Sequence, residues 1–232
     1  VTDRGGLTYD ETFTINLTNV NEAPSGTNVT VTITEDTSHI LTAANFGFSD
    51  VDAGDALSAV RIDTLPTAGT LTLSGVAVTA GQVITTADLA AGQLVFTPAA
   101  NANGTGYARV TFSVRDSTSL YDPTPNQLTV NVTAVNDRPT DLSLSANTVA
   151  EHAANGTVVG TVSGTDPDAG DTKSYSLTNT AGGRFAINRT TGALTVANST
   201  LLNYEAATSH AVTVRVTDRG GLTYDETFTI NL

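Results

Sequence analysis

The stretch VTDRGGLTYDETFTINL, residues 216–232, decides the fold. Just before it and at its start, Val212, Val214 and Val216 are separated by single polar residues, and Phe228, Ile230 and Leu232 again occupy alternate positions near its end. A period of two places such residues on one face of a β-strand. The stretch therefore predicts two half-buried antiparallel strands joined by a tight turn at Gly220-Gly221.

The same seventeen residues, letter for letter, open the chain as residues 1–17. A weaker repeat relates TNVNEAP at 18–24 to TAVNDRP at 133–139. An identity of this length predicts a tandem array, of which the chain spans one period and the start of the next. The predicted parts are residues 1–24, the last hairpin and linker of a preceding repeat; residues 25–139, a complete domain with its linker; and residues 140–232, a second complete domain.

Residues 1–17 on their own are a hairpin without a sheet, and isolated hairpins are marginally stable at best. Two interpretations remain open. Either the rest of that domain lies upstream in the same protein, or the segment completes another copy in trans.

The remaining sequence is typical of short β-strands. Alternation recurs at 29–33, 110–114 and 128–132, and one helical turn is predicted at 86–91. Gly, Asn, Asp and Pro separate these segments, which favours all-β sandwiches of about seven strands each. Both linkers end in proline and are expected to be short, stiff joints.

Composition excludes several classes of function. Acidic residues outnumber basic ones 23 to 10 and Lys173 is the only lysine, so no basic stripe is available for nucleic acid. The three histidines are scattered and no catalytic motif is present, so we expect no enzyme activity. There is no apolar run long enough for a membrane span, and no cysteine for disulfides.

The acidic residues gather in predicted loops rather than spreading evenly. They occur in TITEDT (32–37), FSDVDAGD (48–55), VRDSTS (114–119), TVAEHA (148–153), TDPDAGD (165–171), LLNYEAA (201–207) and VTDRGG (216–221). An aspartate before glycine is also common simply because its side chain caps a turn, and the linker acids could be plain polar residues. The recurrence of one motif in both domains favours a metal site over these simpler interpretations.

The order and spacing of these motifs over residues 140–232 resemble the cadherin repeat. The phrases DPDAGDT, FAINRTTGALTV, LNYE and VTDRG, followed by a linker such as NVNEAP, correspond to successive motifs of that family. Residues 25–139 resemble the related cadherin-like repeats, of VCBS and proteoglycan type, that fill giant bacterial adhesins. The resemblance implies tandem cadherin-like, Ig-like Greek-key β-sandwiches joined end to end.

The resemblance also implies calcium ions held where successive domains meet, by upstream glutamates, linker acids and downstream aspartates. One such set is Glu35, Asn136, Asp137, Asp166, Asp168 and Asp218. A second is Asn21, Glu22, Asp50, Asp52 and Asp116, and Glu151 and Glu205 would serve a junction beyond residue 232.

This chain departs from the family pattern in ways that affect the expected number of ions. Asn19 and Ala134 stand where the linker usually begins with aspartate, and Ala56 and Thr172 replace an asparagine of the DxDxGxN loop. Residues 25–139 have no counterpart of the LDRE motif. We therefore expect one or two ions at each junction.

Calcium also follows from elementary electrostatics. Two carboxylates about 4 Å apart repel by about 4 kcal/mol at an effective dielectric constant of 20, so converging acids need a cation. Calcium accepts six to eight oxygen ligands in flexible geometry, whereas zinc favours His or Cys.

The function implied by the resemblance is a calcium-rigidified spacer in the stalk of a large secreted bacterial adhesin, at the cell surface, supporting attachment and biofilm formation. Its partners would be neighbouring repeats of the same chain. The alternatives are a homophilic or carbohydrate-binding adhesion module, or a repeat unit of an extracellular filament. A binding module predicts an exposed aromatic patch, for which the candidates are Tyr9, Tyr107, Tyr121 and Tyr175.

Overall fold

The two strands predicted at the end of the chain are β17 (Ser209–Thr217) and β18 (Thr223–Asn231) of a computed structural model that describes all residues 1–232. By their contacts, the residues form two compact units. The first comprises Val1–Ile33, Thr37–Pro98 and Thr105–Val132, and the second comprises Thr34–Asp36, Ala99–Gly104 and Thr133–Leu232.

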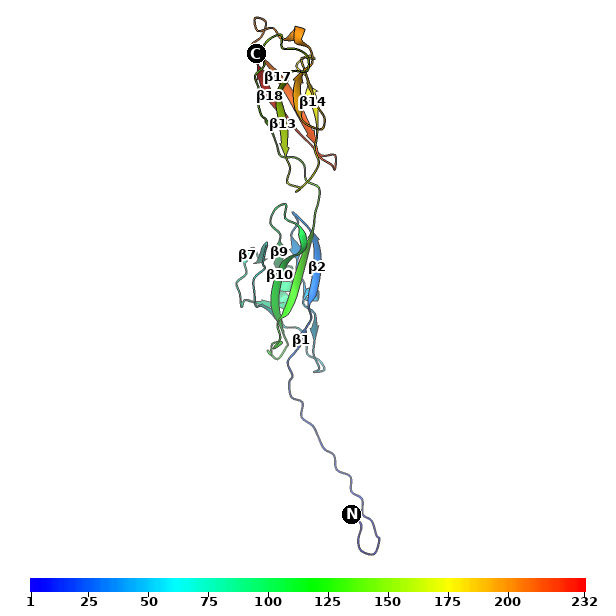
Figure 1. Ribbon diagram of the computed structural model, residues 1–232. Helices are drawn as coiled ribbons and strands as arrows, with labels where there is room; N and C mark the ends of the chain where they lie inside the picture. The colour runs from blue at the N-terminus through cyan, green and yellow to red at the C-terminus, as the bar shows by residue number, and fades with distance from the viewer. The chain divides into compact units, whose positions relative to one another are not determined.

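The first unit is built from three sheets (Figure 1). A five-stranded sheet has the order β2 (Val29–Thr34), β11 (Asn126–Thr133), β10 (Gly104–Arg115), β5 (Ala59–Ile62) and β8 (Val83–Thr85). A four-stranded sheet has the order β3 (His39–Ile40), β9 (Leu94–Thr97), β6 (Thr70–Leu73) and β7 (Val76–Ala77). The third sheet pairs β1 (Ser25–Gly26) with β4 (Phe48–Ser49).

The core of this unit joins the four- and five-stranded sheets, as expected of a sandwich. Phe112 of β10 is fully buried and meets the ring of Phe46 edge-on, with centroids 4.9 Å apart. Phe96 of β9 belongs to the same core cluster. The alternating residues predicted at 110–114 and 128–132 are the ones that point inward, which confirms the strand interpretation there.

The predicted helical turn at 86–91 is α1 (Thr86–Ala90). Thr85 caps it, because its hydroxyl oxygen accepts the backbone N–H of Asp88 at 3.2 Å while the Asp88 carboxylate accepts the backbone N–H of Thr85 at 3.0 Å. Two 3₁₀ turns, Ala43–Asn45 and Ser199–Leu201, are the other helical segments. No helix has the length and apolar character needed to cross a membrane.

The second unit is a sandwich of two antiparallel sheets (Figure 1). One has the order β12 (Asp141–Leu144), β13 (Val158–Thr165), β16 (Ala193–Val196) and β15 (Phe185–Ile187). The other has the order β14 (Ser174–Asn179), β17 and β18. β17 and β18 are paired over nine residues, from Ser209 opposite Asn231 to Thr217 opposite Thr223.

Val212, Val214 and Val216 of β17 are fully buried between these two sheets. Burying a side chain of this size contributes about 1.5–3 kcal/mol each. The core therefore fixes the register of β17, because a slip by one residue would turn all three valines to solvent. That register in turn places Asp218, directly after the strand, at the sheet end where the acidic loops lie.

The copy of this stretch at residues 1–17 has a different environment. Its turn is formed: Asp3 N–H donates to the Leu7 carbonyl at 2.9 Å, and the only ladder contact is an isolated bridge between Thr2 and Thr8. Residues 10–17 form no strand, and Phe13 and Ile15 are 77% and 82% exposed. The turn forms from local hydrogen bonds, whereas the strand needs a sheet to pair with.

Candidate metal centre

Three groups of carboxylates have ligand atoms that all lie within 4.8 Å of one another inside each group. We name them the linker group, the first-unit group and the second-unit group. The linker group is Glu35, Asp137 and Asp168; the first-unit group is Asp50, Asp55 and Asp116; and the second-unit group is Asp166, Asp171 and Asp218.

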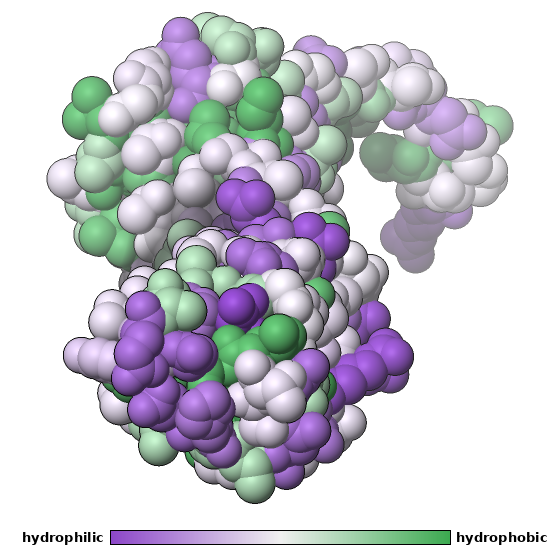
Figure 2. Space-filling model, turned by 90° about the horizontal axis from the view of Figure 1, so that it is seen from above, coloured by the Kyte–Doolittle hydropathy of each residue, from purple (hydrophilic) through white to green (hydrophobic).

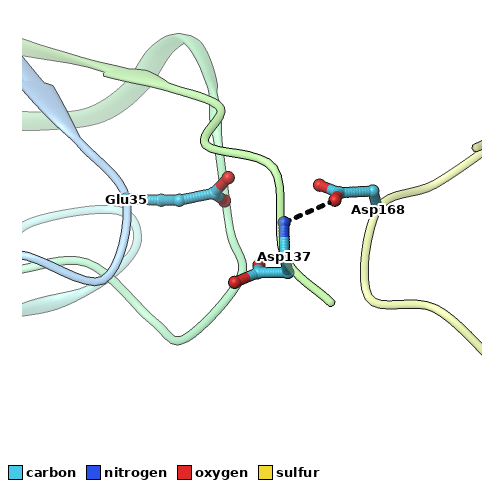
Figure 3. A group of neighbouring side chains, drawn as sticks. All are labelled: Glu35, Asp137 and Asp168. Atoms are coloured by element: carbon cyan, nitrogen blue, oxygen red, sulfur yellow. Dashed lines mark hydrogen bonds between the residues drawn. The ribbon is translucent and has the colours of Figure 1, made fainter. Parts of the chain in front are cut away.

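The linker group draws its members from three segments of the second unit (Figure 3). Glu35 directly follows β2, Asp137 lies in the connection before β12, and Asp168 lies in the loop after β13. Figure 3 shows the Glu35 and Asp168 carboxylates directed toward the linker from opposite sides. The backbone N–H of Asp137 donates to Oδ2 of Asp168 at 2.8 Å, which holds the linker against that loop.

Glu35 is held with its side chain almost fully buried, since the residue is 2% exposed. Its Oε1 accepts the backbone N–H of Val135 at 2.7 Å, and its Oε2 accepts the side-chain N–H of Asn103 at 2.9 Å. Its own backbone N–H donates to the Thr133 carbonyl at 3.0 Å. These bonds fix the position of the carboxylate without neutralising its charge.

In the linker group, the charged form of the Asp137 carboxylate is disfavoured by its surroundings. Burial raises the pKa of its carboxyl above the ordinary value, and the neighbouring charges of Asp36, Asp168, Glu35 and Asp166 raise the pKa further. Its Oδ2 is buried and has no hydrogen-bond partner. The site therefore favours whatever neutralises this carboxylate, either a proton or a cation.

The loop after β13 arranges the second-unit group by local hydrogen bonds. The backbone N–H of Asp168 donates to Oδ1 of Asp166 at 2.9 Å, and that of Asp171 donates to the Asp168 carbonyl at 3.2 Å. This is the turn geometry that an Asp-x-Asp sequence forms on its own. It leaves Oδ2 of Asp166 buried and unpartnered.

Asp218 completes that group from the end of β17. Burial acts to raise its pKa, but hydrogen bonds from Asn136 and from the backbone N–H groups of Leu222, Gly221 and Gly220 lower the pKa overall. The Asn136 side-chain N–H donates to Oδ2 of Asp218 at 2.9 Å. Gly220 is required for this approach, because a Cβ there would lie 2.5 Å from Oδ1 of Asn136.

The connection at 18–24 has the same hydrogen-bond pattern within the first unit. Asn21 donates its side-chain N–H to Oδ2 of Asp116 at 3.1 Å, and the backbone N–H of Glu22 donates to Oδ2 of Asp52 at 2.8 Å. The backbone N–H of Asp52 donates to Oδ1 of Asp50 at 2.9 Å. The side chain of Glu22 itself is exposed and belongs to none of the three groups.

One contact of the first linker has no counterpart at the second. The side-chain N–H of Asn19 donates to Oδ1 of Asp52 at 2.7 Å. In the second linker, Ala134 stands at the position of Asn19, and its side chain has no donor to offer to Asp168. The Asn19 side chain is the largest influence that lowers the pKa of Asp52, followed by the backbone N–H of Glu22. Both oxygens of Asp52 thus already have donors.

The residues of these groups fit a hard divalent cation. Every side-chain ligand is oxygen, which suits calcium and not zinc. Each group also contains one carboxylate oxygen that is buried without a hydrogen-bond partner: Oδ2 of Asp137, of Asp50 and of Asp166. Buried polar atoms are normally paired, so three such atoms, one in each group, are places where an ion would supply the missing partner.

Most of the predicted ligands are brought together, in two clusters. Glu35, Asn136, Asp137, Asp166, Asp168 and Asp218 lie around the second linker, and Asn21, Glu22, Asp50, Asp52 and Asp116 lie around the first. Glu151 and Glu205 are in neither cluster. Glu151 accepts the backbone N–H of Tyr204 at 3.0 Å, and Glu205 is exposed; their role as ligands stays a prediction.

Sequence reasoning missed three residues of the site. Asp55 and Asp171 each follow the glycine of an Asp-x-Asp-x-Gly-Asp phrase and belong to a carboxylate group. Their recurrence at the same place in both domains was a usable signal. Asn103 was also missed, and only the folded chain brings it to Glu35.

The tyrosines considered for an adhesive patch have other surroundings. Tyr107 packs against the core of the first unit, and Tyr175 packs in the second, where its hydroxyl oxygen accepts the Gly164 N–H at 3.1 Å. Tyr121 lies beneath the guanidinium of Arg61, 4.7 Å from the ring centroid. Tyr9 is 66% exposed, in the segment that forms no sheet. Figure 2 likewise shows hydrophobic residues in small separate groups among polar ones on the visible face.

In the comparison with known proteins, two family models match separate parts of the chain. Residues 20–133 match the model described as a cadherin-like domain, and residues 146–232 match the model described as a cadherin domain. A human protein, cadherin-related family member 2, is 37% identical over 111 residues. The match covers 45% of this chain but only 8% of that relative's length.

Solved structures show the same fold. A crystal structure of mouse cadherin-23 repeats EC22–24 is 22% identical with a TM-score of 0.60, covering 91% of this chain and 67% of that one. Repeats EC1–2 of human mucin-like protocadherin are 17% identical with a TM-score of 0.51, covering 90% of this chain and 97% of that one. These likenesses confirm the predicted tandem β-sandwiches.

Proposed function

We propose that this chain, a cadherin-like domain followed by a cadherin domain, is a calcium-stiffened spacer in the stalk of a large secreted bacterial adhesin. The observation that carries the proposal is the buried, unpartnered carboxylate oxygen in each of the three acidic groups. Cadherin-type domains are extracellular, where calcium is millimolar. Extracellular calcium modules bind at roughly 10⁻⁴ to 10⁻³ M, so such sites fill outside the cell.

The residues have separate tasks in this proposal. Glu35, Asp137 and Asp168 would hold one ion. Asn136 and the backbone of the linker hold the loops in place by the hydrogen bonds described above. When bound, calcium supplies the positive charge that cancels repulsion among the carboxylates. Because Glu35, Asp137 and Asp168 lie in three separate segments, the ion would tie those segments together.

The adhesin context rests on the repeat. An identical seventeen-residue stretch at residues 1 and 216 supports an array of such domains, and residues 25–139 resemble the repeats of giant bacterial adhesins. In an array, stiff joints make an extended spacer that holds a distant binding domain away from the surface. Attachment and biofilm formation would follow from that distant domain, and no catalysis is involved.

The test is a thermal melt of the 232-residue chain in 10 mM calcium and in chelator, monitored by circular dichroism. For a dissociation constant of about 10⁻⁴ M, each filled site stabilises by about 2.7 kcal/mol, which corresponds to a rise in Tm of about 10 °C or more. Magnesium at the same concentration is the control and should raise Tm much less. Equal melting temperatures in calcium and in chelator would refute the proposal.

Small-angle scattering on the same samples tests the stiffening separately. A spacer should show a larger and better-defined maximum dimension in calcium than in chelator. The alternative of a homophilic module predicts instead that calcium makes the chain dimerise, which light scattering detects.

A further inference from the structure

The loop Ala99–Gly104 lies against the turn that carries Glu35, and both belong to the second unit. The side-chain N–H of Asn103 donates to Oε2 of Glu35 at 2.9 Å, and the backbone N–H of Asn101 donates to Oδ1 of Asp36 at 2.8 Å. Asp36 and Asn101 have φ of 58° and 55°, a left-handed conformation that Asn and Asp tolerate better than most residues. The sequence of both turns is therefore suited to this contact.

In the cadherin domain, a different loop donates a hydrogen bond to the early glutamate. Its early glutamate, Glu151, accepts the backbone N–H of Tyr204 at 3.0 Å, and the next residue in that loop is Glu205. In each domain, then, an early glutamate accepts a hydrogen bond from a later loop. The residue that accompanies the glutamate is an amide in the first domain, Asn103, and a carboxylate in the second, Glu205.

We infer that Asn103 takes in the cadherin-like domain the place that Glu205 takes in the cadherin domain, and so sets the charge and the calcium affinity of the linker group. A primary amide offers an N–H donor and a carbonyl acceptor at once. Its N–H orients Glu35, and its Oδ1 is a neutral ligand for a cation. The inference rests on the proposed function and adds to it a residue that carries no charge.

Two substitutions at this position should act in opposite directions on calcium. Asn103→Asp adds a carboxylate beside Glu35, so it should lower the Tm in chelator through repulsion and raise calcium affinity about tenfold. Asn103→Ala removes the donor to a charged group and should weaken calcium binding about tenfold. A merely structural residue would instead lose stability and affinity together in both variants.

The experiment is calorimetric calcium titration of the whole chain, with melts in chelator. Asn16→Asp is the matched control, since it makes the same change in the exposed N-terminal segment and should leave affinity unchanged. The Glu35→Gln background assigns the effect to this group: if residues 35 and 103 bind the same ion, the gain in affinity from Asn103→Asp should differ there from the gain in the parent chain.

Each result has a distinct meaning. Opposite shifts for the two variants, changed in size in the Glu35→Gln background, support the inference. If the unchanged chain binds calcium but both variants bind it with the same affinity as the parent, the inference is wrong and the proposed function stands. If the unchanged chain shows no response to calcium, both are wrong.

Discussion

The two linkers share one hydrogen-bond pattern but differ in the acids that surround them. At both, a linker asparagine donates to the aspartate at a strand end and a linker N–H donates to the second aspartate of the Asp-x-Asp loop. At 133–139, however, Asp137 and Glu35 add charge, and the pKa of Asp137 is raised. At 18–24, the Asn19 side chain donates a hydrogen bond to the Asp52 carboxylate, and the pKa of Asp52 is lowered. The shared hydrogen bonds fix the position of each linker against its acidic loop. The surrounding residues decide how strongly the site would attract a cation.

This comparison predicts that Asp168→Ala and Asp52→Ala have unequal effects. Asp168→Ala removes one acid of the linker group and the acceptor of the Asp137 N–H, so calcium should bind the second unit at least about tenfold more weakly. Asp52→Ala should reduce calcium stabilisation less, because Asp52 is in none of the three groups. Calcium titrations of the two variants measure this difference, and equal losses would contradict it.

A smaller effect is expected at the turn after β17. Gly220→Ala places a methyl group against the side chain of Asn136 and should destabilise the second unit by about 1–3 kcal/mol. The matching position in the first domain is Thr118, whose hydroxyl donates to Oδ1 of Asp116 at 3.0 Å. In urea unfolding, Gly220→Ala should lose stability through a steric clash, and calcium should partly restore that stability. Thr118→Ala should lose only the stability that one hydrogen bond contributes. An unchanged midpoint for Gly220→Ala would show that the linker moves freely.

The pH dependence of stability in chelator should have opposite signs at the two linkers. The raised pKa of Asp137 gives stability that is complete below the ordinary value of 3.8 and is lost as pH rises through the native pKa. The lowered pKa of Asp52 gives stability that is present above 3.8 and is lost as pH falls through the native pKa.

Asp137→Asn should therefore stabilise the calcium-free chain at neutral pH and remove its contribution to the pH slope. Asp52→Asn should destabilise the calcium-free chain at neutral pH and remove the contribution of Asp52, which has the opposite sign. Denaturant midpoints between pH 3 and pH 7 provide the measurement, and the same sign for both variants would refute this difference between the linkers.

The smallest effect is expected from exchanging the one unmatched contact. Asn19→Ala removes the donor to Asp52 and should return the pKa of Asp52 toward its ordinary value. Ala134→Asn offers the equivalent donor to Asp168 and should make the second linker resemble the first. Carboxyl chemical shifts followed by NMR through a pH titration report both changes, with little effect on Tm. Identical titration curves before and after the exchange would contradict the role given to Asn19.

Much of the site could be predicted from sequence because its geometry is local. Two aspartates separated by one residue form their turn by themselves, and a strand of known register brings Asp218 to the end of its sheet. The partners of Glu35 could not be predicted this way. Asn103 lies 68 positions from Glu35 in the chain, and only the five-stranded sheet, in which β11 pairs with both β2 and β10, brings their loops close.

The N-terminal copy shows the same limit. Its DRGG turn has the hydrogen bonds of the later copy, since Asp3 and Asp218 both accept the N–H of the leucine four residues on, at 2.8 Å. The strand that follows it depends on β17, which no sequence pattern within those seventeen residues can supply. Local chemistry could therefore be predicted there, and its tertiary partner could not.

The duplicated stretch also provides an internal reference for protease susceptibility. The peptide bond after Phe13 and the bond after Phe228 have identical flanking residues, but Ile15 is 82% exposed and Ile230 is fully buried. A protease that cleaves after phenylalanine would meet the same substrate twice in one molecule, once open and once folded into a sheet. The ratio of the two cleavage rates therefore reports how rarely β18 detaches, with each factor of ten equal to about 1.4 kcal/mol of opening free energy.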